Sequence, residues 1–381
     1  MKGLKTIALS FGVLIAGFIL FGFFRYTINP KITASSLCLR TDNCIKGLHI
    51  SDSGASWLAF SQDGRLLFGE GSGARRWNVE KKFQTKRLGG SSTRRLAVAQ
   101  DGRYAIVKKD ADDAFEITVF DAGGKKIIEV STVSKNIQFL SQLAFTTIAD
   151  MLVMPIRDEE NQNTLLSFWS LRTGEFVTQL PHAAPISSLA TSAGIIAVGL
   201  SSGDIVLWPE GDFNRYSILK ASETSIKELT FDAEGQVLAS ADNDGLIKVW
   251  DMNSKTFIAE FQNPNEYLTD IALSSSPNLL LASYANDDKG RILAWDTATA
   301  EQIGDWAYPR GVGKLAISPD GQQLALNLWR KSTLVTSTVN QTGPNRPTTG
   351  ASRVIVNSQE RSYVKVDPAV ILIRDISDLS D

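Results

Sequence analysis

One short turn returns along this chain about every 43 residues, and this spacing constrains the fold more than any other feature. Clear copies read SQDG at 61–64, AQDG at 99–102, DAEG at 232–235 and SPDG at 318–321, and weaker ones lie at Ala149-Asp150, Ala193-Gly194 and Pro277-Asn278. The steps between the seven turns run from 38 to 48 residues. Such a period indicates a small unit that buries its apolar face only by stacking against its neighbours.

Each turn lies between two short stretches in which apolar and polar residues alternate, as in half-buried β-strands. ELTFD and QVLAS flank the fifth turn, and KLAIS and QQLAL flank the seventh. A third β-run ends in an aromatic residue in six units, at Trp77, Phe120, Trp169, Trp208, Trp250 and Trp295, and Arg374 stands there in the seventh. A short fourth strand follows in those six units, for example FVTQL and FIAEF. Four strands repeated seven times predict an all-β fold, a seven-bladed β-propeller over residues 45–381.

The seventh unit differs from the others in two ways. It has no fourth strand of its own, and IKGLHI at 45–50 is left over before the first unit. We expect these residues to pair with the strand around Ile371–Ile376, because this pairing would remove an exposed sheet edge. An insertion at about 331–369 has a turn-rich middle, TGPNRPTTGAS, between the alternating flanks LVTSTV and RVIVNS. Long insertions are either functional or disordered, and an extended hairpin is one reading of this one.

The fifth unit, LTFDAEGQVLASADNDGLIKVWD, resembles the WD-repeat family, and the unit that ends LAWD at Trp295-Asp296 is the next best match. The resemblance covers residues 45–381 and implies a protein-interaction function. Family repeats often join a His, an Asp, a Ser and a Trp by hydrogen bonds within a blade. The fourth unit has the His as His182, but Ser202 replaces its Asp. The fifth has Asp244, Ser240 and Trp250, but Ser222 replaces its His. The chain therefore resembles a divergent member.

Residues 1–25 contain an uncharged stretch, Thr6–Phe24. Nineteen residues span about 28 Å as a helix, close to the hydrocarbon thickness of a bilayer. We expect an uncleaved signal-anchor transmembrane helix, with a cleaved signal peptide and a buried helix as alternatives. The linker 26–44 carries both cysteines, Cys38 and Cys44. A disulfide between them would place the propeller outside the cytoplasm, whereas two unpaired thiols are the alternative.

Two groups of charged residues are candidate partner-binding sites. In propellers of this family the loops between second and third strands share one face of the ring, called the top face here. Those loops are acidic and could attract a basic partner or a cation, although Asp is also a good turn residue. The acidic residues are Asp110, Asp112, Asp113, Asp158, Glu159, Glu160, Asp204, Asp242, Asp244, Asp287 and Asp288.

A basic run lies in the first two units and is predicted to edge the ring on outer strands. It could bind lipid headgroups or an acidic subunit, or form a solvated strand face. Its members are Arg75, Arg76, Lys81, Lys82, Lys86, Arg87, Arg94 and Arg95.

Composition also argues against several functional classes. The chain has 39 Lys+Arg against 41 Asp+Glu, and this near-balance does not favour binding to nucleic acid. It has only 2 His and 2 Cys, which argues against a zinc or iron–sulfur site. A hydrolase would need a nucleophile beside a base, and we expect no catalytic residues, metal or cofactor. The predicted function is a membrane-tethered interaction scaffold or assembly subunit of a membrane complex with protein partners. The alternatives are an extracytoplasmic propeller enzyme of the metal-dependent lactonase or hydrolase type, and a ligand-binding sensor.

Overall fold

The computed structural model divides the chain into two compact units, Met1–Asn43 and Cys44–Asp381. It describes residues 55–376 except 72, 81–82, 89–92, 110–114, 132–136, 140–141, 159–163, 264–265, 276–277, 287–288, 330, 342–356 and 368–369. The predictions for Thr6–Phe24, Cys38, Cys44 and residues 45–50 therefore lie outside the described residues. Within the described ranges, no helix has the length and apolar character needed to span a membrane.

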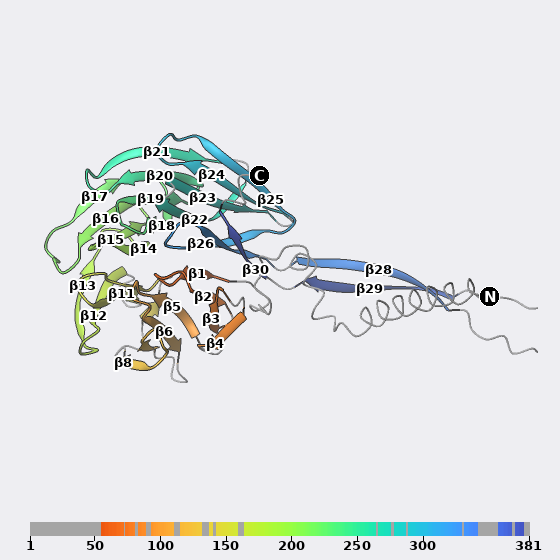
Figure 1. The fold of residues 1–381 in the computed structure, drawn as a ribbon, viewed down its shortest axis with the longest axis horizontal. Coiled ribbons are helices and arrows are strands. Elements are labelled where there is room, and N and C mark those ends of the chain that lie inside the picture. The colour runs from red at the N-terminus through yellow and green to blue at the C-terminus, as the bar shows by residue number, and fades with distance from the viewer. Residues whose placement is uncertain are drawn as a thin grey trace, which may run out of the picture. The chain divides into compact units, whose positions relative to one another are not determined.

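Seven separate antiparallel sheets succeed one another along the second unit, and each is one blade (Figure 1). Blades 1 and 2 are β1 (Trp57–Phe60), β2 (Leu66–Gly71), β3 (Gly73–Asn78), β4 (Phe83–Arg87), and β5 (Thr93–Val98), β6 (Tyr104–Lys109), β7 (Phe115–Phe120), β8 (Lys126–Ser131). Blade 3 is β10 (Ala144–Phe145), β11 (Met151–Asp158), β12 (Thr164–Ser170) and β13 (Phe176–Pro181), with β9 (Ile137–Phe139) paired to β11. Blade 4 is β14 (Ile186–Ser192), β15 (Ile195–Leu200), β16 (Asp204–Pro209) and β17 (Ser217–Lys220).

The last three blades carry the clearest sequence repeats. Blade 5 is β18 (Ile226–Phe231), β19 (Val237–Asp242), β20 (Leu246–Asp251) and β21 (Thr256–Gln262). Blade 6 is β22 (Tyr267–Ser275), β23 (Asn278–Ala285), β24 (Gly290–Asp296) and β25 (Gln302–Tyr308). Blade 7 has three described strands, β26 (Val312–Ile317), β27 (Gln323–Leu328) and β30 (Val370–Asp375). The prediction of a seven-bladed all-β propeller is confirmed.

The first strand of each blade is the innermost, and innermost strands of successive blades are neighbours. β14 contacts β18, β18 contacts β22, β22 contacts β26, and β26 contacts β1, which brings the last blade against the first. The apolar core lies between the flat faces of adjacent sheets. Ile247, Val249 and Phe261 of blade 5, for example, pack with Leu280 and Leu293 of blade 6. This stacking is what the repeat spacing requires, since one blade alone cannot cover its own apolar face.

The recurring turns join the first and second strands. In SQDG the Gly64 N–H donates to Ser61 O over 2.9 Å, and Gly64 has a φ of 67°, which favours glycine. Two of the three weaker copies use the same backbone region, because Asp150 has a φ of 50° and Ala193 a φ of 46°. These turns therefore share one backbone geometry even where their residues differ.

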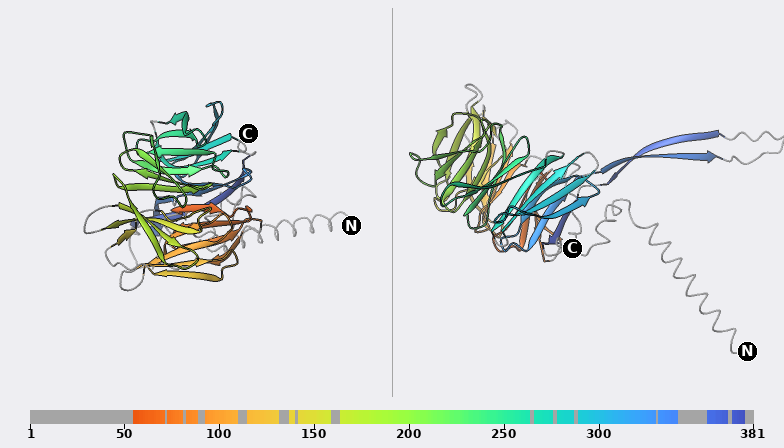
Figure 2. Two further views of the ribbon diagram at one scale, coloured as in Figure 1. Left: turned by 90° about the vertical axis from the view of Figure 1, so that its left-hand side faces the viewer. Right: turned by 90° about the horizontal axis from the view of Figure 1, so that it is seen from above.

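The insertion of blade 7 forms a two-stranded hairpin between β27 and β30 (Figure 2). Its strands are β28 (Lys331–Gln341) and β29 (Asn357–Asp367), paired from Lys331↔Asp367 to Gln341↔Asn357. The expected flank LVTSTV lies within β28, whereas most of RVIVNS lies outside the described residues. Because β27 and β30 also pair directly, the hairpin is an addition to the blade and not part of its sheet.

Five of the outermost strands share a local irregularity. In β4, β8, β13, β21 and β25 a register shift falls beside the aromatic residue that ends the third strand. A β-bulge of this kind bends the strand and interrupts regular pairing at a sheet edge. The residues displaced by the shift are Thr85, Ile127, Val177, Ile258 and Ile303.

Candidate functional site

A central channel runs where the innermost strands meet, and it contains a cavity of about 430 Å³. All seven blades contribute to its wall. Its charged and amide side chains are Glu70, Arg95, Gln142, Lys227, Glu228, Asp270 and Lys314. A volume of this size lies within the range of ligand pockets, and the wall is unusually polar for one.

A repeated β-bulge near the start of the innermost strand places these side chains. The register shifts fall at Arg94 in blade 2, Ser187 in blade 4, Lys227 in blade 5 and Thr269 in blade 6. A bulge sets two residues of one strand opposite one residue of its partner and re-aims side chains locally. The residues that follow these bulges are Arg95, Ser188, Glu228 and Asp270, and three of the four carry a charge.

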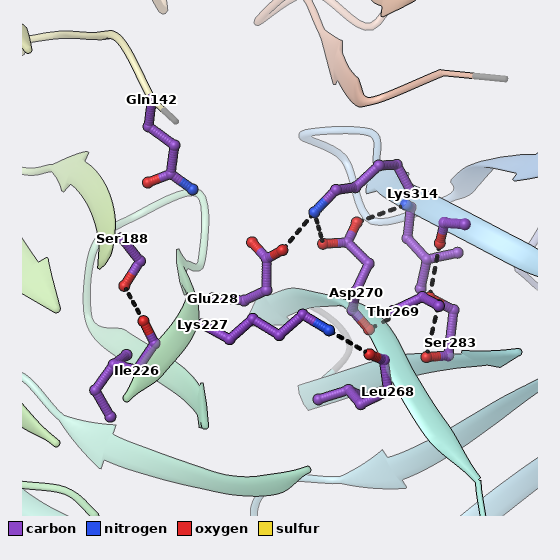
Figure 3. A network of polar contacts seen from close by, with 12 residues as sticks. Gln142, Ser188, Ile226, Lys227, Glu228, Leu268, Thr269, Asp270, Ser283 and Lys314 are labelled. Carbon is purple, nitrogen blue, oxygen red and sulfur yellow. Dashed lines mark hydrogen bonds and ion pairs between the residues drawn. The ribbon is translucent and has the colours of Figure 1, made fainter. Parts of the chain in front are cut away.

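Lys314 forms the centre of an ion-pair network across three blades (Figure 3). Its Nζ lies 2.5 Å from Glu228 Oε1 of blade 5 and 2.9 Å from Asp270 Oδ1 of blade 6. The other Asp270 oxygen accepts the Leu315 N–H over 2.7 Å. Lys314 belongs to blade 7, so its side chain passes blade 6 and ties three successive blades together.

Burial and neighbouring charges together set the pKa values of Glu228 and Lys314 in this network. Desolvation raises the pKa of Glu228, and the nearby Asp270 carboxylate raises it further, against the opposing effect of Lys314. Burial works against the charged Lys314 ammonium too, but the Asp270 and Glu228 carboxylates outweigh it, so the pKa of Lys314 is raised. The lysine therefore stays protonated, while the raised pKa of Glu228 favours its protonated form.

A relay of hydrogen bonds from each bulge to the next blade joins blades 4 to 7. Ser187 Oγ donates to Ile226 O over 2.7 Å, and Lys227 Nζ donates to Leu268 O over 2.6 Å. Thr269 Oγ1 lies 2.7 Å from Val312 O and donates to it. Since a bulge interrupts the ladder, it leaves backbone carbonyls in need of donors, and the preceding blade supplies them.

Other seams are joined by a side-chain acceptor or a side-chain amide donor. Glu70 of blade 1 accepts the Leu96 N–H of blade 2 over 2.9 Å, and Gln142 accepts the Leu189 N–H of blade 4. Burial raises the pKa of Glu70, because the Arg95 guanidinium at 3.5 Å and the Leu96 N–H only partly offset desolvation. Asn327 Nδ2 donates to Ala55 O over 3.3 Å between blades 7 and 1.

Side chains packed closely against a glycine also mark a seam. At Gly199 of blade 4, a Cβ atom would lie 2.1 Å from Ser188 Oγ and 2.7 Å from Ile226 Cγ2 of blade 5. Only glycine leaves this room without moving the neighbouring blade.

Few of the predicted acidic residues have described side chains. Asp242 is 4% exposed: its Oδ2 accepts the Ser222 hydroxyl over 2.6 Å, and its Oδ1 accepts the Asp244 and Leu246 N–H groups, each over 2.9 Å. It stabilises its own turn, while Asp244 is exposed. Asp204 pairs with Lys220 Nζ at 2.7 Å. Asp158 ends β11, and its side chain is outside the described part, as are Asp110, Asp112, Asp113, Glu159, Glu160, Asp287 and Asp288.

The basic run does not form one surface. Arg75 and Arg76 lie on β3, and Lys86 and Arg87 lie opposite them on β4, in the outer half of blade 1. Arg94 and Arg95 depart from the prediction of outer strands, because residues 93–98 pair with β6 as the innermost strand of blade 2. Arg95 therefore lines the channel. Lys81 and Lys82 lie outside the described residues.

The family's hydrogen-bonded group is present in fragments. In blade 4, Trp208 Nε1 donates to His182 Nε2 over 3.3 Å, and burial lowers the pKa of His182, in keeping with a neutral ring. In blade 5, Trp250 Nε1 donates to Ser240 Oγ over 3.1 Å. Ser222 stands in place of the histidine, as expected, and its hydroxyl donates to Asp242 Oδ2 instead of to the predicted Asp244.

The ion-pair network in the channel was not predicted from the sequence. Glu228, Asp270 and Lys314 are separated by 42 and 44 residues, and each stands among apolar letters of an innermost strand. The available signal was their position: a charged residue opens each of ELTFD, DIALS and KLAIS, directly before a buried leucine or isoleucine. Among the described residues, no group of three or more His, Cys, Asp or Glu is placed to hold a metal ion.

Comparison with known proteins agrees with the fold. The family model "WD domain, G-beta repeat" matches residues 213–251, within blades 4 and 5. Eukaryotic translation initiation factor 3 subunit I of Aspergillus terreus is 28% identical over 109 residues, which cover 28% of this chain and 31% of that protein. WD repeat and SOCS box-containing protein 1 of Takifugu rubripes is 28% identical over 116 residues, covering 28% and 27%.

A shorter match, 40% identical over 53 residues, joins the chain to polyadenylation factor subunit 2 of Neurospora crassa and covers 14% of this chain and 8% of that one. Each match spans less than a third of the relative's length. Seven blades, the recurring turn and the matched repeat together define the class, a repeat-built β-propeller. The matched repeat, these relatives and the seven blades support a WD-repeat β-propeller family for this chain.

Proposed function

We propose that this WD-repeat propeller is a non-catalytic protein-interaction scaffold, held to a membrane by Thr6–Phe24 and acting as an assembly subunit of a membrane complex. The observation that supports it most is the contrast between a tightly joined ring and an added hairpin. Side chains tie blade to blade around the channel, whereas β28 and β29 pair only with each other in the described part of the chain. A two-stranded sheet is marginal in water and gains stability when it packs on something else.

The membrane tether and the extracytoplasmic placement rest on sequence alone. The uncharged length of Thr6–Phe24 matches a bilayer, and the pair Cys38 and Cys44 suits an oxidising compartment. Intact mass spectrometry of the membrane-extracted protein tests both. We expect residue 6 to be retained and the two thiols to resist alkylation until reduction. A chain that begins after Tyr26 would contradict the anchor.

The scaffold function is tested by purification in mild detergent with identification of the bound proteins. We expect a stable set of partners that shrinks when residues 341–352 are deleted from the hairpin tip. Changing Asp158, Glu159 and Glu160 to Ser tests the acidic loops in the same assay. If neither change alters the bound set while the propeller stays folded, the contact surface is not on the top face.

The channel cavity favours a second candidate function, the binding of a small polar ligand. Its wall presents cationic and carboxylate groups around about 430 Å³, which would suit a molecule that carries both charges. Native mass spectrometry of the purified chain would detect a bound small molecule. A ligand that is lost in a Lys314→Met variant that stays folded would support sensing over scaffolding.

A further inference from the structure

The hairpin of blade 7 ends in two long, regular strand edges. β28 and β29 form a two-stranded sheet of their own, so no other described strand pairs with either edge. With eleven residues each, they are the longest strands of the described chain, and their ladder has no register shift. Since bulges interrupt five outermost strands of the ring, the hairpin edges depart from the way in which those blades end.

The two strands differ in charge. β29 contains Glu360, Arg361, Lys365 and Asp367, whereas residues 332–341 of β28, STLVTSTVNQ, contain no charged residue. Half of these β28 residues are Thr or Val, which favour strands, and none is Gly or Pro. Charged residues, prolines and bulges are the devices that keep an edge strand from pairing with another chain. Residues 332–341 have none of these devices, so the edge of β28 is the one suited to pairing.

Length favours a second copy of the chain as the partner of β28. Strands of globular proteins average about 5–6 residues, so the edge of a typical sheet would leave almost half of β28 unpaired. The β28 strand of a second copy has the same eleven residues and can pair along its whole length. Two such strands in antiparallel arrangement are related by a two-fold axis, the commonest symmetry of protein dimers.

The β28 sequence is compatible with pairing to itself. A two-fold axis at Thr336, the middle residue, sets Lys331 of one copy opposite Gln341 of the other, and Thr333 opposite Val339. No residue then lies opposite a like charge, an arrangement that would destabilise the pair. The combined sheet ends on both sides in β29, whose charged residues oppose further addition, so the assembly closes at two copies.

We propose that two copies of this chain associate through β28, which pairs antiparallel with β28 of the second copy about Thr336. The resulting sheet has the order β29–β28–β28–β29. Alternate residues of the two central strands exchange about ten backbone hydrogen bonds. Four strands are also more stable than the two strands of a single hairpin. This inference goes beyond the scaffold function, because the partner is a second copy and not a different protein.

The molecular mass of the full chain tests the proposal. Size exclusion with light scattering in mild detergent should show a dimer. Thr336→Lys and Thr336→Glu should each weaken the dimer by about tenfold or more, because each sets like charges opposite one another at the axis. An equimolar mixture of the two variants should restore the dimer, since the introduced charges then have opposite signs.

The matched control is Ser362→Lys, which adds the same charge to β29 directly opposite Thr336 in the hairpin. This variant should remain a dimer. Urea denaturation should give the same midpoint for all these variants, because the hairpin is not part of a blade sheet. If Ser362→Lys abolishes the dimer as completely as Thr336→Lys, the association is not specific to the β28 edge and the proposal is overturned.

A disulfide cross-link checks the register independently. In a chain that carries Cys38→Ser and Cys44→Ser, Thr336→Cys should form a covalent dimer under mild oxidation. Directly opposite residues of antiparallel strands have Cα atoms about 4.5–5.5 Å apart, which a disulfide can bridge. Ser362→Cys in the same background should stay uncross-linked, and equal cross-linking of the two variants would contradict the proposed register.

Two further outcomes would overturn the proposal. One is a parent chain that stays monomeric, and the other is a dimer that survives both Thr336→Lys and Thr336→Glu. If the parent is monomeric and Thr336→Lys instead changes the set of co-purifying proteins, β28 contacts a different protein. The proposal is then wrong, while the scaffold function stands.

Discussion

Single polar side chains, more than apolar ones, distinguish one seam of this propeller from another. Thr269 is an example, because its hydroxyl reaches Val312 O at 2.7 Å and Ser283 Oγ at 2.8 Å. Backbone ladders hold each sheet together but do not cross between sheets. The buried groups at a seam must therefore be satisfied by side chains, and each unsatisfied group costs about 1–3 kcal/mol.

Thr269→Val tests this account with little change in shape. The variant should lose about 1–3 kcal/mol in the free energy of unfolding, because Val312 O loses a donor. Urea denaturation followed by tryptophan fluorescence measures the change. Thr256→Val at the exposed start of β21 is the control and should stay within about 0.5 kcal/mol of the parent.

Lys314→Met should be more damaging. It leaves Glu228 and Asp270 close together without their cation, and breaking a buried pair in this way costs about 3–5 kcal/mol. The same urea experiment measures the loss. Restoration of stability by the triple variant Lys314→Met, Glu228→Gln, Asp270→Asn would show that the uncompensated carboxylates caused it.

Glu70 makes the stability of the ring depend on pH. Burial raises its pKa above the ordinary value of 4.5, so the folded state holds the proton more tightly than the unfolded state. This contribution is complete below pH 4.5 and is lost as the pH rises through the higher folded value. Unfolding free energies from pH 4 to 7.5 should therefore show the advantage of the parent over Glu70→Gln shrinking as the pH rises. A constant difference would contradict the shift.

At the scale of elements, the strands were predictable and their bulges were not. Alternating letters around each turn placed three strands in every blade, and Trp250 or Trp295 marked the end of the third. The bulges at Lys227 and Thr269 depend on how closely a neighbouring blade approaches, and no local pattern records this distance. The channel network follows from these bulges, so it too remained hidden, and Arg95 was assigned to an outer strand.

We expect the propeller to fold without the hairpin formed by β28 and β29. Leu328 of β27 and Val370 of β30 are directly opposite, so a short turn can join them. Replacing residues 331–368 with Asn-Gly should leave the free energy of unfolding within about 1 kcal/mol of the parent, because shortening a loop changes little. Urea denaturation checks this. A large loss would show that β28 and β29 pack on the ring.

At the scale of the whole molecule, one sheet is a strand short in the described residues. Blade 7 has three strands where the six others have at least four. We expect IKGLHI at 45–50 to be the missing outer strand beside β30. Replacing these six residues with a Gly–Ser sequence should lower the urea midpoint markedly, whereas the same replacement at 26–31 should not. Equal midpoints would mean that the ring closes through β26 and β1 alone.

The seams described above also bear on how such a ring could be rearranged. Thr269 needs a carbonyl at the place of Val312, Gly199 needs the approach of Ile226, and Glu70 needs the N–H of Leu96. The border residues of each blade therefore fit one particular neighbouring blade, although all blades share the same basic architecture. Blades copied, swapped or reordered in a chimaera would keep their own sheets and still fail to close, because the order of the blades is itself encoded in the residues at their borders.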